Sequence, residues 1–123
     1  MRQKNQYGHF QRFGPATKNS ILGLKAAYKY ELAFRQEVFL TIAMTPLALY
    51  IAESFVEFGL LMSGLFAILI TELLNSAIEA TVDRVSLDHH ELSGRAKDIG
   101  SAAVFVAIIY FLIIWISKIL TLF

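Results

Sequence analysis

The segment LITELLNSAIEATVD, residues 69–83, decides how the rest of the chain is interpreted. Its polar side chains recur at spacings of three and four residues, which places them within an arc of roughly 80° on one helical face. The other faces of this helix are apolar. Charged groups in such a helix are costly when it lies in lipid, and they usually serve a function. The members of this polar stripe are Glu72, Asn75, Glu79 and Asp83.

Composition and the flanking segments favour a membrane protein. The chain has 123 residues, is 56% hydrophobic and contains no cysteine, which predicts a single domain without disulfides or thiolate metal sites. Residues 32–52, 58–80 and 99–122 each provide roughly the twenty apolar residues that cross a bilayer. Residues 16–30 have the pattern of a helix lying at the membrane interface, although a helix packed on a soluble core is an alternative. We predict an all-α membrane protein with three transmembrane helices, an N-terminal surface helix and an irregular start before residue 16.

The basic residues predict the topology. Seven of the eleven Lys and Arg residues lie before residue 38, three lie in the polar connection at residues 83–98, and none lies in the acidic connection at residues 53–57. The positive-inside rule then places the N-terminus and the second connection in the cytoplasm and the C-terminus outside, with Lys118 as a minor exception. A basic N-terminal region also suits nucleic acid, but the three apolar spans favour a multi-pass protein of the cytoplasmic (inner) membrane.

Helix geometry sets the depth of each acid. At about 1.5 Å per residue, Glu72 lies roughly 20 Å from the outer end of its span, and Glu31 and Glu79 lie roughly 30 Å from theirs. For a hydrocarbon core of ~30 Å, Glu31 and Glu79 reach the cytoplasmic boundary, while Glu72 sits about two turns deeper. The third span begins at the same boundary with Lys97, Asp98 and Ser101.

This arrangement is typical of phosphoryl transfer at a membrane surface. Carboxylates at the boundary suit Mg²⁺, which proteins commonly hold with one or two carboxylates plus substrate phosphates. Lys97 would contact those phosphates. Partial desolvation makes the deeper Glu72 a candidate general base for a lipid hydroxyl, and Asn75 would orient it or bind substrate. The chain has neither a GxxxxGK[ST] motif nor a glycine-rich kinase loop, so a nucleotide site here would be non-standard.

Three longer motifs are similar to those of a known family. GLKAAYKYELAFRQE (residues 23–37), ELLNSAIEATVDR (72–84) and HELSGRAKDIGSAAV (90–104) resemble the integral-membrane diacylglycerol kinases of bacteria, in order and separation. The resemblance covers nearly the whole chain after Arg12. It implies a homotrimer with active sites between subunits at the cytoplasmic face, which transfers the γ-phosphate of ATP to the sn-3 hydroxyl of diacylglycerol to give phosphatidic acid. The related undecaprenol kinases share the core acids but usually differ around these flanks.

The resemblance also implies roles for individual residues. Glu72 matches the family's proposed base, and Glu31 and Glu79 match its metal-binding acids. The expected catalytic residues are Glu72, Asn75 and Lys97. The expected ATP-binding residues are Arg12, Asn19, Glu31, Glu79, Asp88, His89, His90, Lys97 and Asp98, although the first two residues of the 88–90 loop differ from the family's usual form. The expected substrate-binding residues are Ser20, Lys25, Arg35, Gln36, Glu37, Glu72 and Ser101.

Several of these residues also have purely structural interpretations. Glu31 and Arg35 are spaced as an i,i+4 ion pair, and Glu37 could pair with Arg35 instead. Asp83 could mark a helix end at the water. Further structural alternatives are solvated positions for His89 and His90, an N-cap at Ser93, helix packing at Ser101, and close helix approach at Gly64 and Gly100.

Two other functional classes fit parts of the pattern. A small proton-coupled transporter also uses a membrane-buried acid, but near the bilayer midplane and without a phosphate-binding lysine. A structural subunit would pair its acids with basic residues of a partner. The gathering of acids beside Lys97 at one boundary favours an enzyme. Polar residues on all three spans are hard to shield within one short chain, so self-association is expected.

Overall fold

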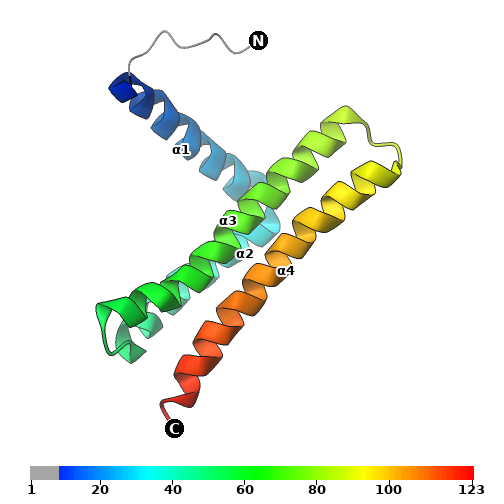
Figure 1. Ribbon diagram of the computed structural model, residues 1–123. Helices are drawn as coiled ribbons and strands as arrows, with labels where there is room; N and C mark the ends of the chain where they lie inside the picture. The colour runs from blue at the N-terminus through cyan, green and yellow to red at the C-terminus, as the bar shows by residue number, and fades with distance from the viewer. Residues whose placement is uncertain (1–8) are drawn as a thin grey trace.

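The computed structural model describes residues 9–123, which form only helices and short connections. A 3₁₀ turn, η1 (His9–Arg12), precedes α1 (Phe13–Tyr30), α2 (Leu32–Ile51), α3 (Phe55–Val85) and α4 (Glu91–Leu120). Figure 1 shows α3 and α4 as a long antiparallel pair, with α2 beside α3 and α1 projecting away from the bundle. Helices α2, α3 and α4 are each long and apolar enough to cross a membrane, which confirms the predicted all-α class and its three spans.

The helix boundaries correct the length expected for the polar connection between α3 and α4. The connection predicted at residues 83–98 is only residues 86–90, because α3 continues to Val85 and α4 already begins at Glu91. The N-cap of α4 is His90, whose Nδ1 accepts the Leu92 N–H at 3.1 Å, so Ser93 is not the cap. Glu91 then pairs with Arg95 at 3.2 Å. Polar residues here extend the helices past the apolar segments rather than ending them.

The N-terminal region is also more helical than predicted. Residues 1–8 of the expected irregular start lie outside the described residues, but residues 9–15 are helical. Pro15 falls in the first turn of α1, where its missing N–H removes no intrahelical bond. Helix α1 ends at Glu31, whose extended backbone (φ −110°, ψ 105°) separates it from α2. This corner turns α1 away from the bundle (Figure 1).

The core lies between α2, α3 and α4 in the half of the bundle away from the 86–90 connection. Ala48, Leu61, Leu65 and Trp115 form its buried centre. The Trp115 indole N–H donates to the Leu61 carbonyl at 3.0 Å, so Trp115 is a packing residue and not an interfacial one. At Gly64, an added Cβ would lie 2.9 Å from the Phe111 Cα, so α3 and α4 approach through their backbones there, as predicted.

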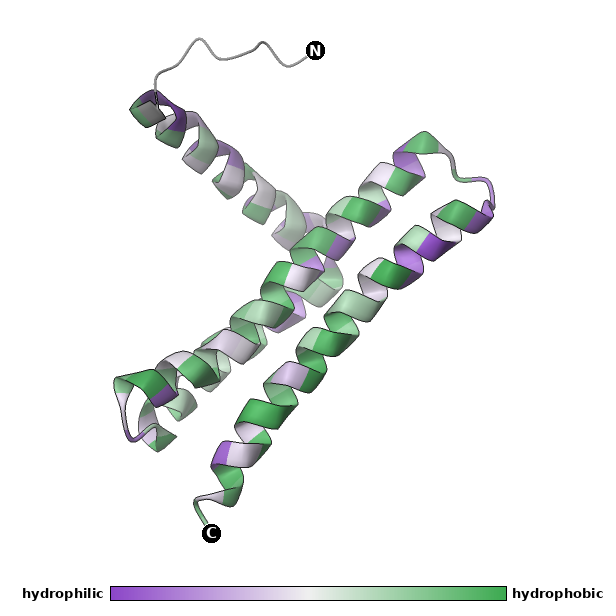
Figure 2. Ribbon diagram, viewed as in Figure 1, coloured by the Kyte–Doolittle hydropathy of each residue, from purple (hydrophilic) through white to green (hydrophobic). Residues whose placement is uncertain are grey.

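Most of the remaining apolar surface faces outward. Phe39, Ile42, Phe105 and Ile113 are each more than half exposed, and they come from α2 and α4. Figure 2 shows the hydrophobic ribbon along these helices, with polar positions concentrated in α1 and near the 86–90 connection. A soluble monomer rarely exposes this much contiguous apolar surface, whereas lipid or another subunit covers it readily.

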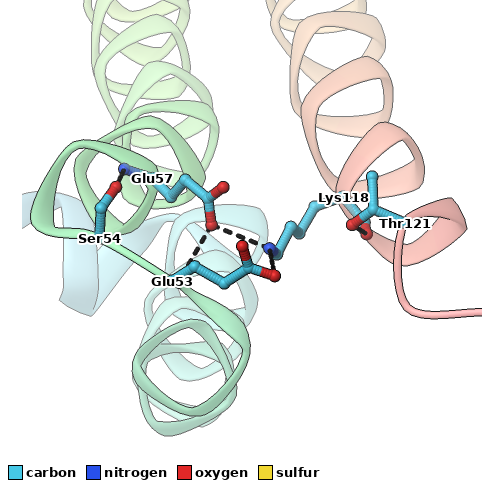
Figure 3. A network of polar contacts seen from close by, with 5 residues as sticks. All are labelled: Glu53, Ser54, Glu57, Lys118 and Thr121. Carbon is cyan, nitrogen blue, oxygen red and sulfur yellow. Dashed lines mark hydrogen bonds and ion pairs between the residues drawn. The ribbon is translucent and has the colours of Figure 1, made fainter.

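Three charged side chains join the helix ends opposite the 86–90 connection. Lys118 of α4 contacts Glu57 at 2.8 Å and Glu53 at 3.4 Å, and its own side chain is only 9% exposed (Figure 3). Glu57 also accepts the Glu53 N–H at 2.8 Å, while its own N–H donates to the N-cap hydroxyl of Ser54. The region predicted as an acidic loop is therefore largely the capped first turn of α3. We call Glu53, Glu57 and Lys118 the outer-end cluster.

Candidate active site

The polar stripe on α3 lies at the junction of three helices. Glu72 and Asn75 are each 8% exposed, and Glu79 is half-buried. Glu72 is close enough to Glu79 and Glu31 for their negative charges to repel. Glu37 of α2 interacts with Glu72 in the same way. Four carboxylates from α2, α3 and the α1–α2 corner therefore converge, as the depth calculation predicts for Glu31, Glu72 and Glu79.

These acids lack a basic partner among residues 9–123. Glu31 and Arg35 form no ion pair, because the contact between them is the helical backbone bond from the Arg35 N–H to the Glu31 carbonyl. The Glu37 Oε2 atom is buried and has no hydrogen-bond partner within the described chain. Burial removes hydration from such carboxylates, and mutual repulsion adds to that cost. A bound cation or a donor from another molecule would relieve both costs.

Asn75 lies between Glu72 and Glu79 in the stripe and forms a hydrogen bond with Glu79. Its Nδ2 donates to Glu79 Oε1 at 3.4 Å, across one helical turn. In the described region Asn75 Oδ1 is buried and accepts no hydrogen bond. The amide therefore orients the Glu79 carboxylate, and its contact is to Glu79 rather than to Glu72.

Lys97, which was expected to contact phosphates, forms an ion pair with an acid of α3 in this structure. Its Nζ pairs with Asp83 at 2.6 Å, which joins the ends of α3 and α4 next to the 86–90 connection. Glu79 is also within electrostatic range of Lys97, so the lysine lies at the edge of the acidic group. Asp83 is thus more than a helix-end acid, since it holds the lysine next to the site. Both side chains remain about half exposed, and water or phosphate can reach them.

A cleft at the α3–α4 connection brings together most of the loop residues expected to bind ATP. Its volume is about 210 Å³. His90 has a structural role as the cap of α4, and the Asp88 N–H donates to the Ser86 hydroxyl at 3.0 Å. Its lining includes Asp83, Asp88, His89, His90, Ser93 and Lys97. Asp98 is exposed and is not among them.

An apolar groove between α1 and α3 reaches one of these acids, Glu31. Its volume is about 700 Å³, and it is lined by Ser20, Glu31, Leu73 and Ser76 among small and apolar residues. Lys25 lines a neighbouring groove between α1 and α2. The other expected substrate residues, Arg35, Gln36, Glu37, Glu72 and Ser101, line neither groove.

The structure does not bring every expected residue to the site, and it adds one. Arg12 and Asn19 are exposed. Arg12 ends η1 directly before α1, and the N-terminal end of α1 projects away from the bundle (Figure 1). Ser76 was not predicted, yet its Oγ is buried without a partner in the described chain. Since Ser76 follows Glu72 by four residues, helical spacing would have placed it on the flank of the same stripe.

The acidic side chains alone do not form a complete metal site in the described part of the chain. No set of three or more Asp, Glu or His side chains within residues 9–123 is arranged to hold a metal ion by itself. The acids around Glu72 remain unneutralised by basic side chains. This donor set fits a hard cation that takes the rest of its ligands from phosphates and water, because Mg²⁺ is usually held in that way.

Fold and site together define a small helical membrane protein with an acidic group at the junction of its helices. Residues 18–119 match the family model "Prokaryotic diacylglycerol kinase". A diacylglycerol kinase of Haemophilus influenzae is 48% identical over 81% of this chain and 85% of its own length. Those of Pseudomonas aeruginosa and Escherichia coli K12 are 47% and 46% identical, over 95% and 86% of this chain and 94% and 87% of their own lengths. The chain belongs to the prokaryotic diacylglycerol kinase family. The comparisons support a kinase over the transporter and structural-subunit alternatives.

Proposed function

We propose that this protein transfers the γ-phosphate of ATP to the sn-3 hydroxyl of diacylglycerol, giving phosphatidic acid and ADP. The observation that carries the proposal is the buried Glu72 carboxylate, which has no basic partner in residues 9–123 and lies within electrostatic range of Glu79 and of Glu31, the acid that lines the apolar groove. A kinase with a water-soluble substrate needs no buried, unpaired carboxylate. A base at the position of Glu72 suits a lipid hydroxyl instead.

Each residue has a defined part in the proposed step. Glu72 accepts the proton of the lipid hydroxyl, whose oxygen then bonds to the γ-phosphorus as the bond to the β–γ bridging oxygen of ATP breaks. Asn75 holds the Glu79 carboxylate. Lys97, at the edge of the acidic group, contacts the phosphates. Glu31 and Glu79 are the residues that would hold Mg²⁺, which when bound neutralises charge on the transferred phosphoryl group.

The two openings of the site fit the two substrates. The groove between α1 and α3 is mostly apolar and contains Ser20 and Ser76, which suits an acyl chain and a glycerol headgroup. The cleft at residues 86–90 is polar and contains Lys97 and His89, which suits a nucleotide. Because the residues before position 38 and the region 83–98 carry ten of the eleven Lys and Arg residues, we place α1 and this cleft in the cytoplasm, with the outer-end cluster on the opposite side of the inner membrane.

The roles proposed for Arg12, Asn19, Gln36 and Ser101 depend on how the subunits assemble. We propose a homotrimer in which Arg12 of η1 and Asn19 of α1 approach the acidic site of a neighbouring subunit, since within one subunit the N-terminal end of α1 projects away from the bundle (Figure 1). Ser101 and Gln36 are exposed and would face the subunit interface or the bound lipid. Exposed apolar residues on α2 and α4 provide the surface for this assembly.

The test is a substrate panel with purified protein in mixed micelles containing ATP and Mg²⁺. We expect phosphatidic acid from diacylglycerol, and slower or no phosphorylation of monoacylglycerol, ceramide and undecaprenol. Faster turnover of undecaprenol would assign the chain to that related activity. If none of the four lipids is phosphorylated, the proposal is wrong. Removal of Mg²⁺ with a chelator should abolish turnover, and its return should restore it.

A further inference from the structure

The side-chain amide of Asn75 has one possible orientation in this structure. Its Nδ2 donates to Glu79 Oε1, so Oδ1 points away from Glu79. The reverse orientation would place the amide oxygen against a carboxylate oxygen, which is unfavourable because both are acceptors. Oδ1 is buried and accepts no hydrogen bond from the described residues. The amide is therefore held by its single contact to Glu79 and by whatever lies on its other side.

The surface on that other side is Gly100 of α4. Gly100 is buried, and a Cβ added there would overlap Asn75 Oδ1. The same Cβ would lie 3.4 Å from Asn75 Cγ and 3.5 Å from Ile78 Cδ1, at ordinary contact distances. The carboxamide thus occupies the space that any side chain at position 100 would fill. Close helix approach was predicted at this glycine, and here the approaching group is a site residue.

We propose that Gly100 is a positioning residue for the active site. Its missing side chain lets the Asn75 amide lie against α4, and that position directs Nδ2 at the Glu79 carboxylate. Gly100 touches no substrate and acts through Asn75 on Glu79. The proposal rests on the proposed function in one respect, because it takes Glu79 to be a ligand of the Mg²⁺ that accompanies the nucleotide.

A second glycine on the same helix pair provides a contrast. At Gly64 the added Cβ would meet the Phe111 Cα at 2.9 Å, and a backbone atom moves only if α3 and α4 separate. At Gly100 the overlap is with the end of a flexible side chain, which rotates away without moving either helix. Gly64→Ala should therefore lower stability, whereas Gly100→Ala should keep the fold and displace the amide.

The experiment compares Gly100→Ala, Gly64→Ala and a matched control, Gly59→Ala, in the full-length protein. Gly59 lies in α3 with nothing within 4 Å of an added Cβ. The readouts are the thermal midpoint, binding of Mn²⁺ with a non-hydrolysable ATP analogue followed by electron paramagnetic resonance, and steady-state kinetics against Mg²⁺. We expect Gly100→Ala to retain the wild-type midpoint but to bind Mn²⁺ about tenfold or more weakly, the usual cost of losing a group that orients a metal ligand. Its apparent KM for Mg·ATP should rise more than its kcat falls.

A double variant tests whether Asn75 transmits the effect. In an Asn75→Ala background, Gly100→Ala should cause no further loss of Mn²⁺ affinity, because the group it displaces is already absent. Wild-type affinity in Gly100→Ala, or losses that multiply in the double variant, would overturn the proposal. If the wild-type protein phosphorylates no lipid and binds no Mn²⁺·nucleotide, the proposed function has failed instead. If the wild type does both and only the glycine prediction fails, the proposed function stands.

Discussion

Glu72 is the residue whose environment most needs a functional explanation. Its carboxylate is 8% exposed, has no ion pair in the described chain, and lies near the charges of Glu79 and Glu31. Glu72→Gln keeps the size and removes the base, so turnover should fall by about 10²–10⁴-fold, the usual contribution of a general base. Phosphatidic acid formation is the measurement. Glu53→Gln, an exposed acid of the outer-end cluster, is the control and should retain turnover.

The Glu72→Gln result also separates catalysis from binding. The affinity for Mn²⁺ with an ATP analogue should change little, because Glu72 is not assigned as a metal ligand. Turnover within a few-fold of wild type would exclude Glu72 as the base while leaving the kinase activity intact.

At the scale of single residues, helical periodicity predicted much of the site. Periodicity and depth alone place Glu31, Glu72 and Glu79 together, because both follow directly from helix geometry. The partner of Lys97 was not predictable, since Asp83 and Lys97 come from different helices and meet only when α3 and α4 pack. The contact between Gly100 and Asn75 was missed for the same reason. Side-chain packing between helices depends on rotation about each axis, which one sequence does not reveal.

At the scale of helices, the outer-end cluster ties α4 to the start of α3. Lys118 is nearly buried between Glu53 and Glu57, so its removal leaves two carboxylates facing each other (Figure 3). Lys118→Met keeps the side-chain length and should lower the thermal midpoint by a few degrees while turnover per folded molecule stays near wild type. Lys18→Met, on exposed α1, is the matched control and should leave the midpoint unchanged.

A charge-paired variant completes this test. Lys118→Met combined with Glu57→Gln should recover part of the lost stability, because the uncompensated carboxylate is then also removed. An unchanged midpoint in Lys118→Met would mean that the cluster does not stabilise the helix ends.

The elements themselves were predictable in type and order but not in length. Three apolar segments of about twenty residues specify three spanning helices, since only such segments satisfy the backbone in lipid. Hydropathy loses its signal where a helix leaves the membrane, so the polar ends of α3 and α4 were assigned to a connection. The caps at Ser54 and His90 fix the true starts of α3 and α4. The break at Glu31 coincides with the predicted change from surface helix to span.

At the scale of the whole molecule, the proposed sharing of sites between subunits gives a quantitative prediction. Arg12→Ala and Glu72→Gln should each inactivate the assembly if Arg12 serves a neighbour's site. Co-assembly of the two variants in equal amounts should restore activity to about a quarter of the wild-type value, because about one interface in four then carries both intact residues. The measurement is phosphatidic acid formation after mixed refolding. Mixtures no more active than either variant alone would place both residues in one subunit's site.

The short connection at residues 86–90 affects the order in which the helices associate during folding. Because it joins α3 and α4 through a small loop, bringing these helices together costs little chain entropy. Contacts beside this connection, such as that of Asp83 with Lys97, close only short loops and form early, and pairing of the rest of α3 with α4 can extend from them. The α3–α4 hairpin should therefore associate soon after membrane insertion, with α2 docking against it later. Unfolding by mechanical force from the N-terminus should accordingly release α2 first and the hairpin last, as one cooperative unit.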